Sequence, residues 1–276
     1  MARRPRQRSS SQSGRTSALW GATLLLLAMA AFGALAWFYF YAPRKPVLDS
    51  RSLCPVTGSK GIAIVLMDTS DVILETTKSD ILTFLEDQIT ALPEYHSFDI
   101  RVLDIATGQS RSLFAKCNPG DGDGLSEWTD NPRVARLRWI ESFKKPAREA
   151  LSKGLAPVDT QSSPIMGAVQ HVAITQFSSA AAQAVPKRLI IVSDMIEHTR
   201  DYSQYPIAGD LTYQRFKQSP AYRKFRTDLH GTHVTILYVD RPKLKLDTIR
   251  HISFWREWIS DNRGSFGSAQ RLQGAN

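Results

Sequence analysis

Hydrophobic residues form one long run near the start of the chain and several short runs later. Residues 18–42 contain no charged side chain. At about 1.5 Å per residue, a helix of this length reaches roughly 37 Å and crosses a hydrocarbon core of about 30 Å. Trp20 lies at one end of the run and Trp37 and Tyr41 at the other, where aromatic rings favour the membrane interface. The pattern predicts a transmembrane helix over residues 17–42.

Charges around this run predict its orientation. Five arginines and no acidic residue precede it, whereas Arg44 and Lys45 follow it and are diluted by Asp49. The positive-inside rule then places the N-terminus in the cytoplasm and the remainder outside, as in a single-pass protein of a bacterial inner membrane with a periplasmic domain. The alternative is a cleaved signal peptide, because Ala34-Leu35-Ala36 resembles a cleavage site. The run is longer than an ordinary signal-peptide core, which favours an anchor contacting membrane lipid.

After the apolar run, strand-like and helix-like patterns alternate. Continuous apolar or β-branched runs predict strands, and apolar residues spaced three and four apart predict helices. Strands are expected at 62–67, 98–105, 112–115, 189–192 and 233–239. Helices are expected at 79–92, 132–151, 164–177, 216–229 and 248–261, and Pro220 is expected to break or delay the fourth of them. The predicted fold class is therefore α/β, with a mostly parallel central sheet, one antiparallel edge strand and helices on both faces.

Composition divides the chain further. The content of 42% hydrophobic and 22% charged residues suits one large domain, expected at 61–264. The Arg/Ser/Gln-rich residues 1–16 are expected to be a disordered cytoplasmic tail, 43–60 a stiff Pro-containing linker and 265–276 a flexible tail. The tail arginines supply more than half of the net charge of +9. No stripe of basic and aromatic residues remains, which argues against a nucleic-acid partner.

The two cysteines fit an external domain. Cys54 and Cys117 would both face an oxidising compartment, where a disulfide is expected. Two buried thiols are the alternative. A zinc site is excluded for this pair alone, because no cluster of histidines or further cysteines accompanies it.

Polar residues gather where predicted strands end. Asp68, Ser70 and Asp71 follow the first strand, Asp194 follows the strand at 189–192, and Ser163 precedes a helix. Parallel strands bring their carboxyl ends to one edge of a sheet, where ligands of α/β proteins bind. Carboxylate and hydroxyl oxygens suit a hard cation such as Mg²⁺. The alternative is that these residues only cap helices.

The element order and these loops resemble the von Willebrand factor A (integrin I-like) family. Its metal-ion-dependent adhesion site combines a D-x-S-x-S loop with a hydroxyl on a middle loop and a later aspartate. Asp68 and Ser70 match the first loop, Ser163 the middle hydroxyl and Asp194 the last position, whereas Val72 replaces the final serine. The resemblance implies a degenerate site for Mg²⁺, or for Mn²⁺ or Ca²⁺, with Asp71 as a possible additional ligand.

The resemblance also implies a function. Von Willebrand A-like domains bind protein partners, so the expectation is a non-enzymatic interaction module of a bacterial envelope assembly. Glu197-His198, just past Asp194, could line the same cleft. One alternative is an inert structural scaffold of such a complex. The other is a phosphatase-like hydrolase, whose signature needs a second aspartate where this chain has Ser70.

Overall fold

The computed structural model describes residues 13–41, 45–68, 70, 72–125, 131–156, 160, 162–205, 211–241, 243–244 and 246–272. The chain divides into two compact units, Met1–Pro46 and Val47–Asn276.

The first unit contains one long helix, α1, which runs from Ser13 to Tyr41. Its segment Trp20–Tyr41 has 22 residues and is apolar enough to cross a membrane, and none of it is buried inside the protein. A helix of that length measures about 33 Å, close to the hydrocarbon thickness of a bilayer. The predicted N-terminal apolar helix is confirmed, whereas its insertion into a membrane is part of the proposal below.

The second unit is built on one sheet of six strands in the order β3-β2-β1-β4-β5-β6. The strands are β1 (Gly61–Met67), β2 (His96–Asp104), β3 (Gln109–Cys117), β4 (Lys187–Ser193), β5 (His233–Val239) and β6 (Ser265–Leu272). Only β3 is antiparallel to its neighbour, and every other pair is parallel. The chain therefore winds outward from β1 in both directions, and the strand order reverses between β1 and β4. The predicted α/β fold with an antiparallel edge is confirmed.

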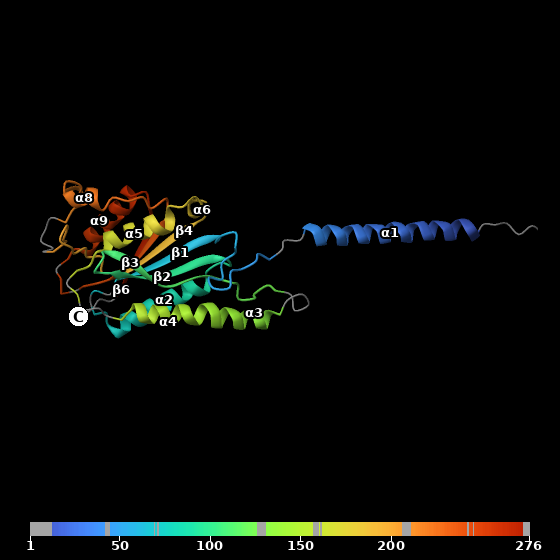
Figure 1. Ribbon diagram of the computed structural model, residues 1–276, viewed down its shortest axis with the longest axis horizontal. Coiled ribbons are helices and arrows are strands. Elements are labelled where there is room, and N and C mark those ends of the chain that lie inside the picture. Colours follow the sequence, from blue (N-terminus) through green and yellow to red (C-terminus); the bar gives the residue numbers. More distant parts are fainter. Residues whose placement is uncertain are drawn as a thin grey trace, which may run out of the picture. The chain divides into compact units, whose positions relative to one another are not determined.

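Helices cover both faces of this sheet, as the unbroken apolar strands require. They are α2 (Glu75–Thr90), α3 (Pro132–Trp139), α4 (Lys145–Gly154), α5 (Ile165–Val172), α6 (Ala180–Gln183), α7 (Tyr213–Lys217), α8 (Pro220–Lys224) and α9 (Thr248–Asp261). A π-helical segment, Ile140–Lys144, joins α3 to α4, and a second one, Ala173–Phe177, extends α5. One core places α5, α7, α8 and α9 against one face, and the other core places α2, α3 and α4 against the opposite face (Figure 1).

The chain enters the domain near the amino ends of the central strands. Cys54 forms a disulfide with Cys117 at the end of β3, as predicted. In the chain-entropy view, a loop of this length is worth about 4 kcal/mol of stability. The backbone N–H of Val56 donates to the carbonyl of Val47, which closes a turn beside the disulfide.

Several parts of the chain differ from the sequence-based expectation. The predicted disordered tail is wrong for residues 13–16, which form the start of α1. From Val47 onward the predicted linker belongs to the second unit, because the disulfide and the turn hold it there. The predicted flexible tail is wrong for residues 265–272, which form β6 against β5. The helix expected at 216–229 is two short helices, α7 and α8, and the interruption expected at Pro220 is present, because Pro220 starts the second helix. Residues 1–12 and 273–276 lie outside the described part of the chain.

Candidate functional site

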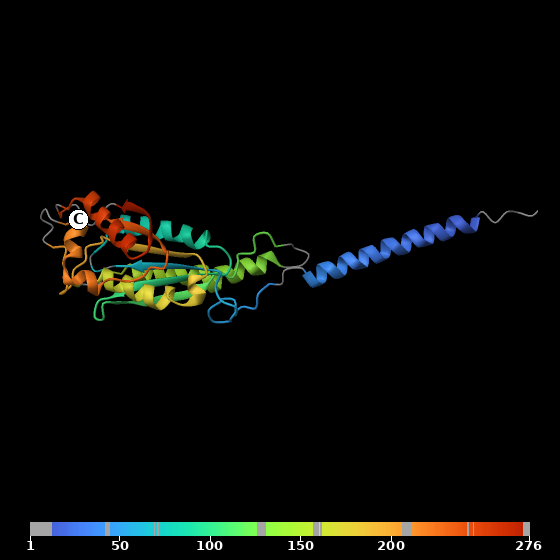
Figure 2. The ribbon, with the colours of Figure 1, turned by 90° about the horizontal axis from the view of Figure 1, so that it is seen from above.

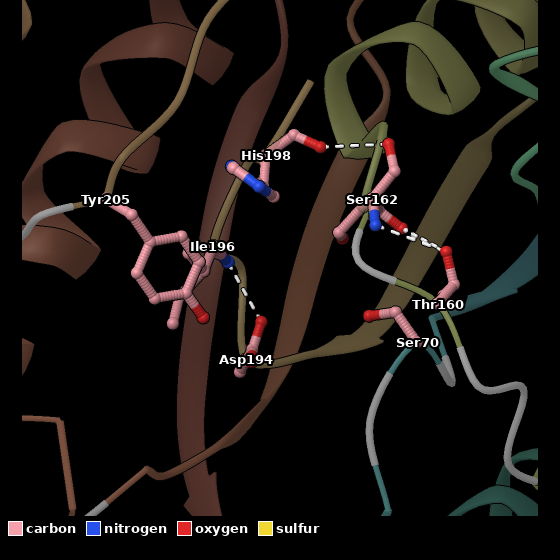
Figure 3. Close-up of a pocket in the computed structure, with 8 residues that line it drawn as sticks. Ser70, Thr160, Ser162, Asp194, Ile196, His198 and Tyr205 are labelled. Carbon is pink, nitrogen blue, oxygen red and sulfur yellow. Dashed lines mark hydrogen bonds between the residues drawn. The ribbon is translucent and has the colours of Figure 1, made fainter. Parts of the chain in front are cut away.

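The predicted polar residues meet at the carboxyl ends of β1 and β4, where the strand order reverses. Asp68 directly follows β1, Asp194 directly follows β4, and Ser163 lies just before α5. A cavity of about 280 Å³ opens at this edge (Figure 3). It is lined by Ser70, Thr160, Ser162, Ser163, Asp194, Ile196, His198 and Tyr205. The structure thus brings together Asp68, Ser70, Ser163 and Asp194, whereas Asp71 lies outside the described residues.

Asp68 is the internal anchor of this edge. Its side chain is buried, and its Oδ2 accepts hydrogen bonds from the Ser163 hydroxyl at 2.8 Å and the Ser193 hydroxyl at 2.9 Å. Its Oδ1 accepts from the backbone N–H of Ser70 at 3.0 Å. One carboxylate therefore ties together the loops after β1 and β4 and the start of α5. Because charged hydrogen bonds are the stronger ones, this geometry is well fixed.

Asp194 is held by a cation from a third loop. Its Oδ1 accepts from the backbone N–H of Ile196 at 2.9 Å, and its Oδ2 accepts from Nε of Arg241 at 2.8 Å. Arg241 follows β5, and its side chain is 17% exposed against 4% for Asp194. The guanidinium neutralises this carboxylate in a largely dry environment, where leaving it uncompensated would be costly.

Glu197 is fully buried, does not line the cavity, and accepts a hydrogen bond from the start of α5. Its Oε2 accepts from the backbone N–H of Met166, in the first turn of that helix, at 2.8 Å. Burial raises the pKa of Glu197 to about 8, against the lowering effect of this hydrogen bond, with Asp68 adding a repulsive charge. The carboxyl is therefore largely protonated at neutral pH, so its proton removes a charge that the interior could not solvate.

A buried polar chain runs from Glu197 toward α9. The amide oxygen of Gln204 accepts from the backbone N–H of Glu197 at 2.9 Å and lies 3.1 Å from Nε2 of His251. The hydroxyl of Tyr238 lies 2.8 Å from Nδ1 of the same imidazole. Burial lowers the pKa of His251 to about 4, so the ring is neutral at neutral pH. The wall behind the cavity is thus held by neutral hydrogen bonds.

The open side of the cavity carries hydroxyl and aromatic groups. The Ser162 hydroxyl donates to the carbonyl of His198 at 3.0 Å, and Thr160 and Ser162 bond to each other (Figure 3). The imidazole of His198 packs edge-on against Tyr205, with ring centroids 5.3 Å apart. His198 lines the cavity as the sequence suggested, whereas Glu197 does not line it and is fully buried.

These residues do not fit a divalent cation as they stand. Asp194 is already paired with Arg241, and a second cation beside the guanidinium would be repelled. The position of the missing serine, Val72, is 67% exposed and offers no oxygen from its side chain. Within the described residues, no group of three carboxylate, histidine or cysteine side chains is arranged around a common point.

Sequence reasoning missed two residues of this edge, Arg241 and Ser193. Both had a signal. Ser193 immediately precedes Asp194 at a strand end, and Arg241 follows the strand at 233–239 within two residues. Any residue directly after a parallel strand lies at this edge of the sheet and is a candidate site residue, even where the family motif does not include it.

Comparisons with known proteins give distant structural similarity. No family model matches the sequence, and no curated protein matches it. An aerotolerance-related membrane protein from Bacteroides fragilis is 10% identical, with a TM-score of 0.35, over 76% of this chain and 90% of that one. A von Willebrand factor type A protein from Catenulispora acidiphila is 17% identical, with a TM-score of 0.38, over 76% of this chain and 38% of that one. The strand order and the antiparallel edge are what make this fold von Willebrand A-like.

Proposed function

We propose that the chain is a membrane-anchored protein-interaction module that binds a protein partner through the cavity at the carboxyl ends of β1 and β4. The supporting observation is the position of this cavity within the second unit. The chain enters that unit beside Cys117, near the amino ends of the central strands, whereas the cavity opens at their carboxyl ends. The recognition surface therefore lies at the end of the domain opposite its attachment.

The anchor is the apolar helix α1. Its length suits a bilayer, the arginines before it favour a cytoplasmic N-terminus, and the Cys54–Cys117 disulfide suits an oxidising compartment. These features support a single-pass inner-membrane protein of bacteria with a periplasmic domain. Such a module would serve as one component of an envelope assembly.

The cavity suits one small polar side chain of the partner. Its hydroxyl groups can donate and accept, and the carboxylate that lines it, Asp194, is already paired with Arg241. Recognition would then rest on hydrogen bonds and shape. A bridging Mg²⁺, Mn²⁺ or Ca²⁺, which the family resemblance implies, is left out of this mechanism because of the ion pair.

A substitution that fills the cavity tests this proposal. Ser70→Arg places a long side chain at the cavity wall, and Ser79→Arg places the same side chain at an exposed position of α2 as a control. The measurement is quantitative capture of partner proteins, after cross-linking in native membranes, by the full chain and by each variant. Loss with Ser70→Arg alone is expected. Equal capture by both variants would favour the inert scaffold.

The same site supports a non-enzymatic role. A phosphatase-like reaction would need Asp68 as a nucleophile, yet both of its oxygens accept hydrogen bonds and its side chain is buried. Ser70 stands where a general acid or base is needed. Turnover of a generic phosphoester that Asp68→Asn abolished would reverse this assignment.

A further inference from the structure

The outer side of α3 combines exposed aliphatic and basic side chains. Val134 is 50% exposed and Leu137 is 61% exposed, and Arg133 and Arg138 are also exposed. At 3.6 residues per turn, these four side chains lie within an arc of about 140°. The buried Trp139 lies on the opposite side and fixes that side to the core. We call Arg133, Val134, Leu137 and Arg138 the α3 outer face.

This face has an excess of positive charge. Between Pro132 and Arg148 the chain has six basic residues and one acidic residue. Within the described part of the chain, no carboxylate oxygen lies within 4.0 Å of Arg133 or Arg138. By contrast, Arg136, on the side of α3 toward the domain, pairs with Asp121 at 3.0 Å. The two arginines that flank Val134 and Leu137 are therefore the ones that point their charge outward.

A hydrogen bond, a disulfide and an ion pair link the point where the chain enters the domain to α3. Val47 is hydrogen-bonded to Val56, and Cys54 between them is disulfide-bonded to Cys117. The loop after Cys117 reaches Asp121, which pairs with Arg136 of α3. In both views, α3 lies at the end of the sheet opposite α8 (Figures 1 and 2).

The covalent length of the chain limits how far this end of the domain can be from the end of α1. Residues 42–46 are the only chain between Tyr41 and Val47. Fully extended, they reach roughly 20 Å. If α1 spans a bilayer, the entry point of the domain cannot leave the headgroup region by more than about that distance.

We propose that the α3 outer face docks on the surface of the membrane that holds the anchor, with Arg133 and Arg138 on anionic phospholipid headgroups and Val134 and Leu137 at the boundary with the acyl chains. Basic residues flanking exposed aliphatic residues on a helix are the pattern of an interfacial segment. The attraction is short-ranged and salt-sensitive, so it acts only where a short tether keeps the helix near the surface. This inference rests on the membrane anchorage in the proposed function and is independent of the cavity.

Hydrogen exchange of the full chain in vesicles tests the proposal. The chain, with its disulfide intact, is reconstituted into phosphatidylcholine vesicles and into vesicles that also contain phosphatidylglycerol. Slower exchange of the backbone amides of residues 132–139 is expected only in the anionic vesicles. Arg133→Gln with Arg138→Gln should weaken docking roughly 30-fold, about fivefold for each arginine, and restore the exchange seen in neutral vesicles.

A matched control carries the same change of charge elsewhere. Arg223→Gln with Lys243→Gln removes two exposed basic side chains, one on α8 and one after β5, and should keep the protection of α3. Raising the salt to about 1 M, where the Debye length is about 3 Å, should remove it.

Several results would overturn the docking proposal. Equal exchange of α3 in both kinds of vesicle would do so, as would protection that survives in the double arginine variant. Protection that depends on the density of protein in the vesicle and not on lipid charge would assign the face to a second copy of the chain instead. A chain that fails to float with the vesicles would instead overturn the anchorage, and hence the proposed function, which separates the two failures.

Discussion

The two ends of the sheet differ in the burial and pairing of their charged side chains. At the carboxyl end, the charged groups are buried and paired: Asp68 accepts three hydrogen bonds and Asp194 is held by Arg241. At the amino end, Arg133 and Arg138 extend into solvent from α3, and no carboxylate oxygen of the described residues lies within 4.0 Å of either one. The cavity at the carboxyl end presents hydroxyl groups, whereas α3 presents net positive charge.

This difference indicates two modes of recognition on one domain. Buried pairs are screened little by salt and contribute mainly by fixing geometry, so the cavity should select its partner by shape and hydrogen bonds. Exposed arginines act over a Debye length and select by charge. The two ends should therefore respond differently to substitution, pH, metal and salt.

The largest expected effect is at the carboxyl end. Arg241→Gln should lower the free energy of unfolding by roughly 3–5 kcal/mol, because it leaves Asp194 buried beside a neutral group. Chemical denaturation of the full chain in detergent, followed by circular dichroism, measures this. Arg271→Gln, which breaks an exposed pair with Asp240, should cost less than about 1 kcal/mol.

A double variant checks the cause. In Asp194→Asn with Arg241→Gln the buried charge is gone, so most of the lost stability should return. If the double variant were as unstable as the sum of the single ones, the pair would not be coupled, and the contrast between the two ends would fail.

Glu197, at the carboxyl end, should make the free energy of unfolding depend on pH. Because burial raises its pKa from 4.5 to about 8, the folded state holds a proton that the unfolded state loses. Its contribution to stability is complete below about pH 4.5 and is lost as the pH rises through 8, a fall of roughly 3 kcal/mol between pH 5 and pH 8. Denaturation curves across this range measure it, and Glu197→Gln should flatten the profile.

A second buried group, His251, limits the pH range in which stability reports on Glu197. The pKa of His251 is lowered to about 4 by burial, so its contribution is present above pH 6.5 and is lost toward pH 4. From about pH 7.5 to pH 8 the change in stability therefore reports mainly Glu197, because His96, His171 and His251, whose pKa values are lowered by burial, are neutral there in both the folded and the unfolded state. Glu149→Gln, on the exposed side of α4, should leave the profile unchanged, and a flat wild-type profile would show that Glu197 is ionised in the fold.

Most of the fold could be predicted because its central strands, β1, β4 and β5, are apolar on both faces. The strand at 233–239 and the helix at 248–261 were predicted with the bounds that the structure has. β6 was missed because Ser265–Leu272 is an edge strand whose residues are mostly exposed and polar, so no apolar run marks it. Its pairing depends on β5, which a local pattern cannot show.

The site was predicted in position more than in chemistry. Strand ends place Asp68, Ser70, Ser163 and Asp194 at one edge, which follows from the topology of a parallel sheet. The partner of Asp194 could not be predicted from the family pattern, because Arg241 comes from a loop that the pattern does not include. Arg241 neutralises Asp194 because the folded chain brings the loop after β5 next to this carboxylate, and the local sequence does not show that contact.

A metal titration distinguishes an edge that Arg241 already neutralises from an adhesion-type metal site. In the wild type, Arg241 occupies the electrostatic role of a cation, so millimolar Mg²⁺ or Mn²⁺ should not raise the midpoint of thermal unfolding. Arg241→Gln removes the guanidinium that neutralises Asp194, and a cation bound there at ten times its dissociation constant would stabilise the fold by about 1.4 kcal/mol. A gain in the wild type equal to that in the variant would restore the adhesion-type metal site that the family resemblance implies.

The smallest effect on stability is expected at the amino end. Arg133→Gln with Arg138→Gln should change the free energy of unfolding in detergent by less than about 0.5 kcal/mol, because both side chains are exposed and make no ion pair within the described residues. The same variant should nevertheless lose the exchange protection of α3 in anionic vesicles. A large loss of stability in detergent would mean that these arginines hold the fold together, and the two ends would then use charge in the same way.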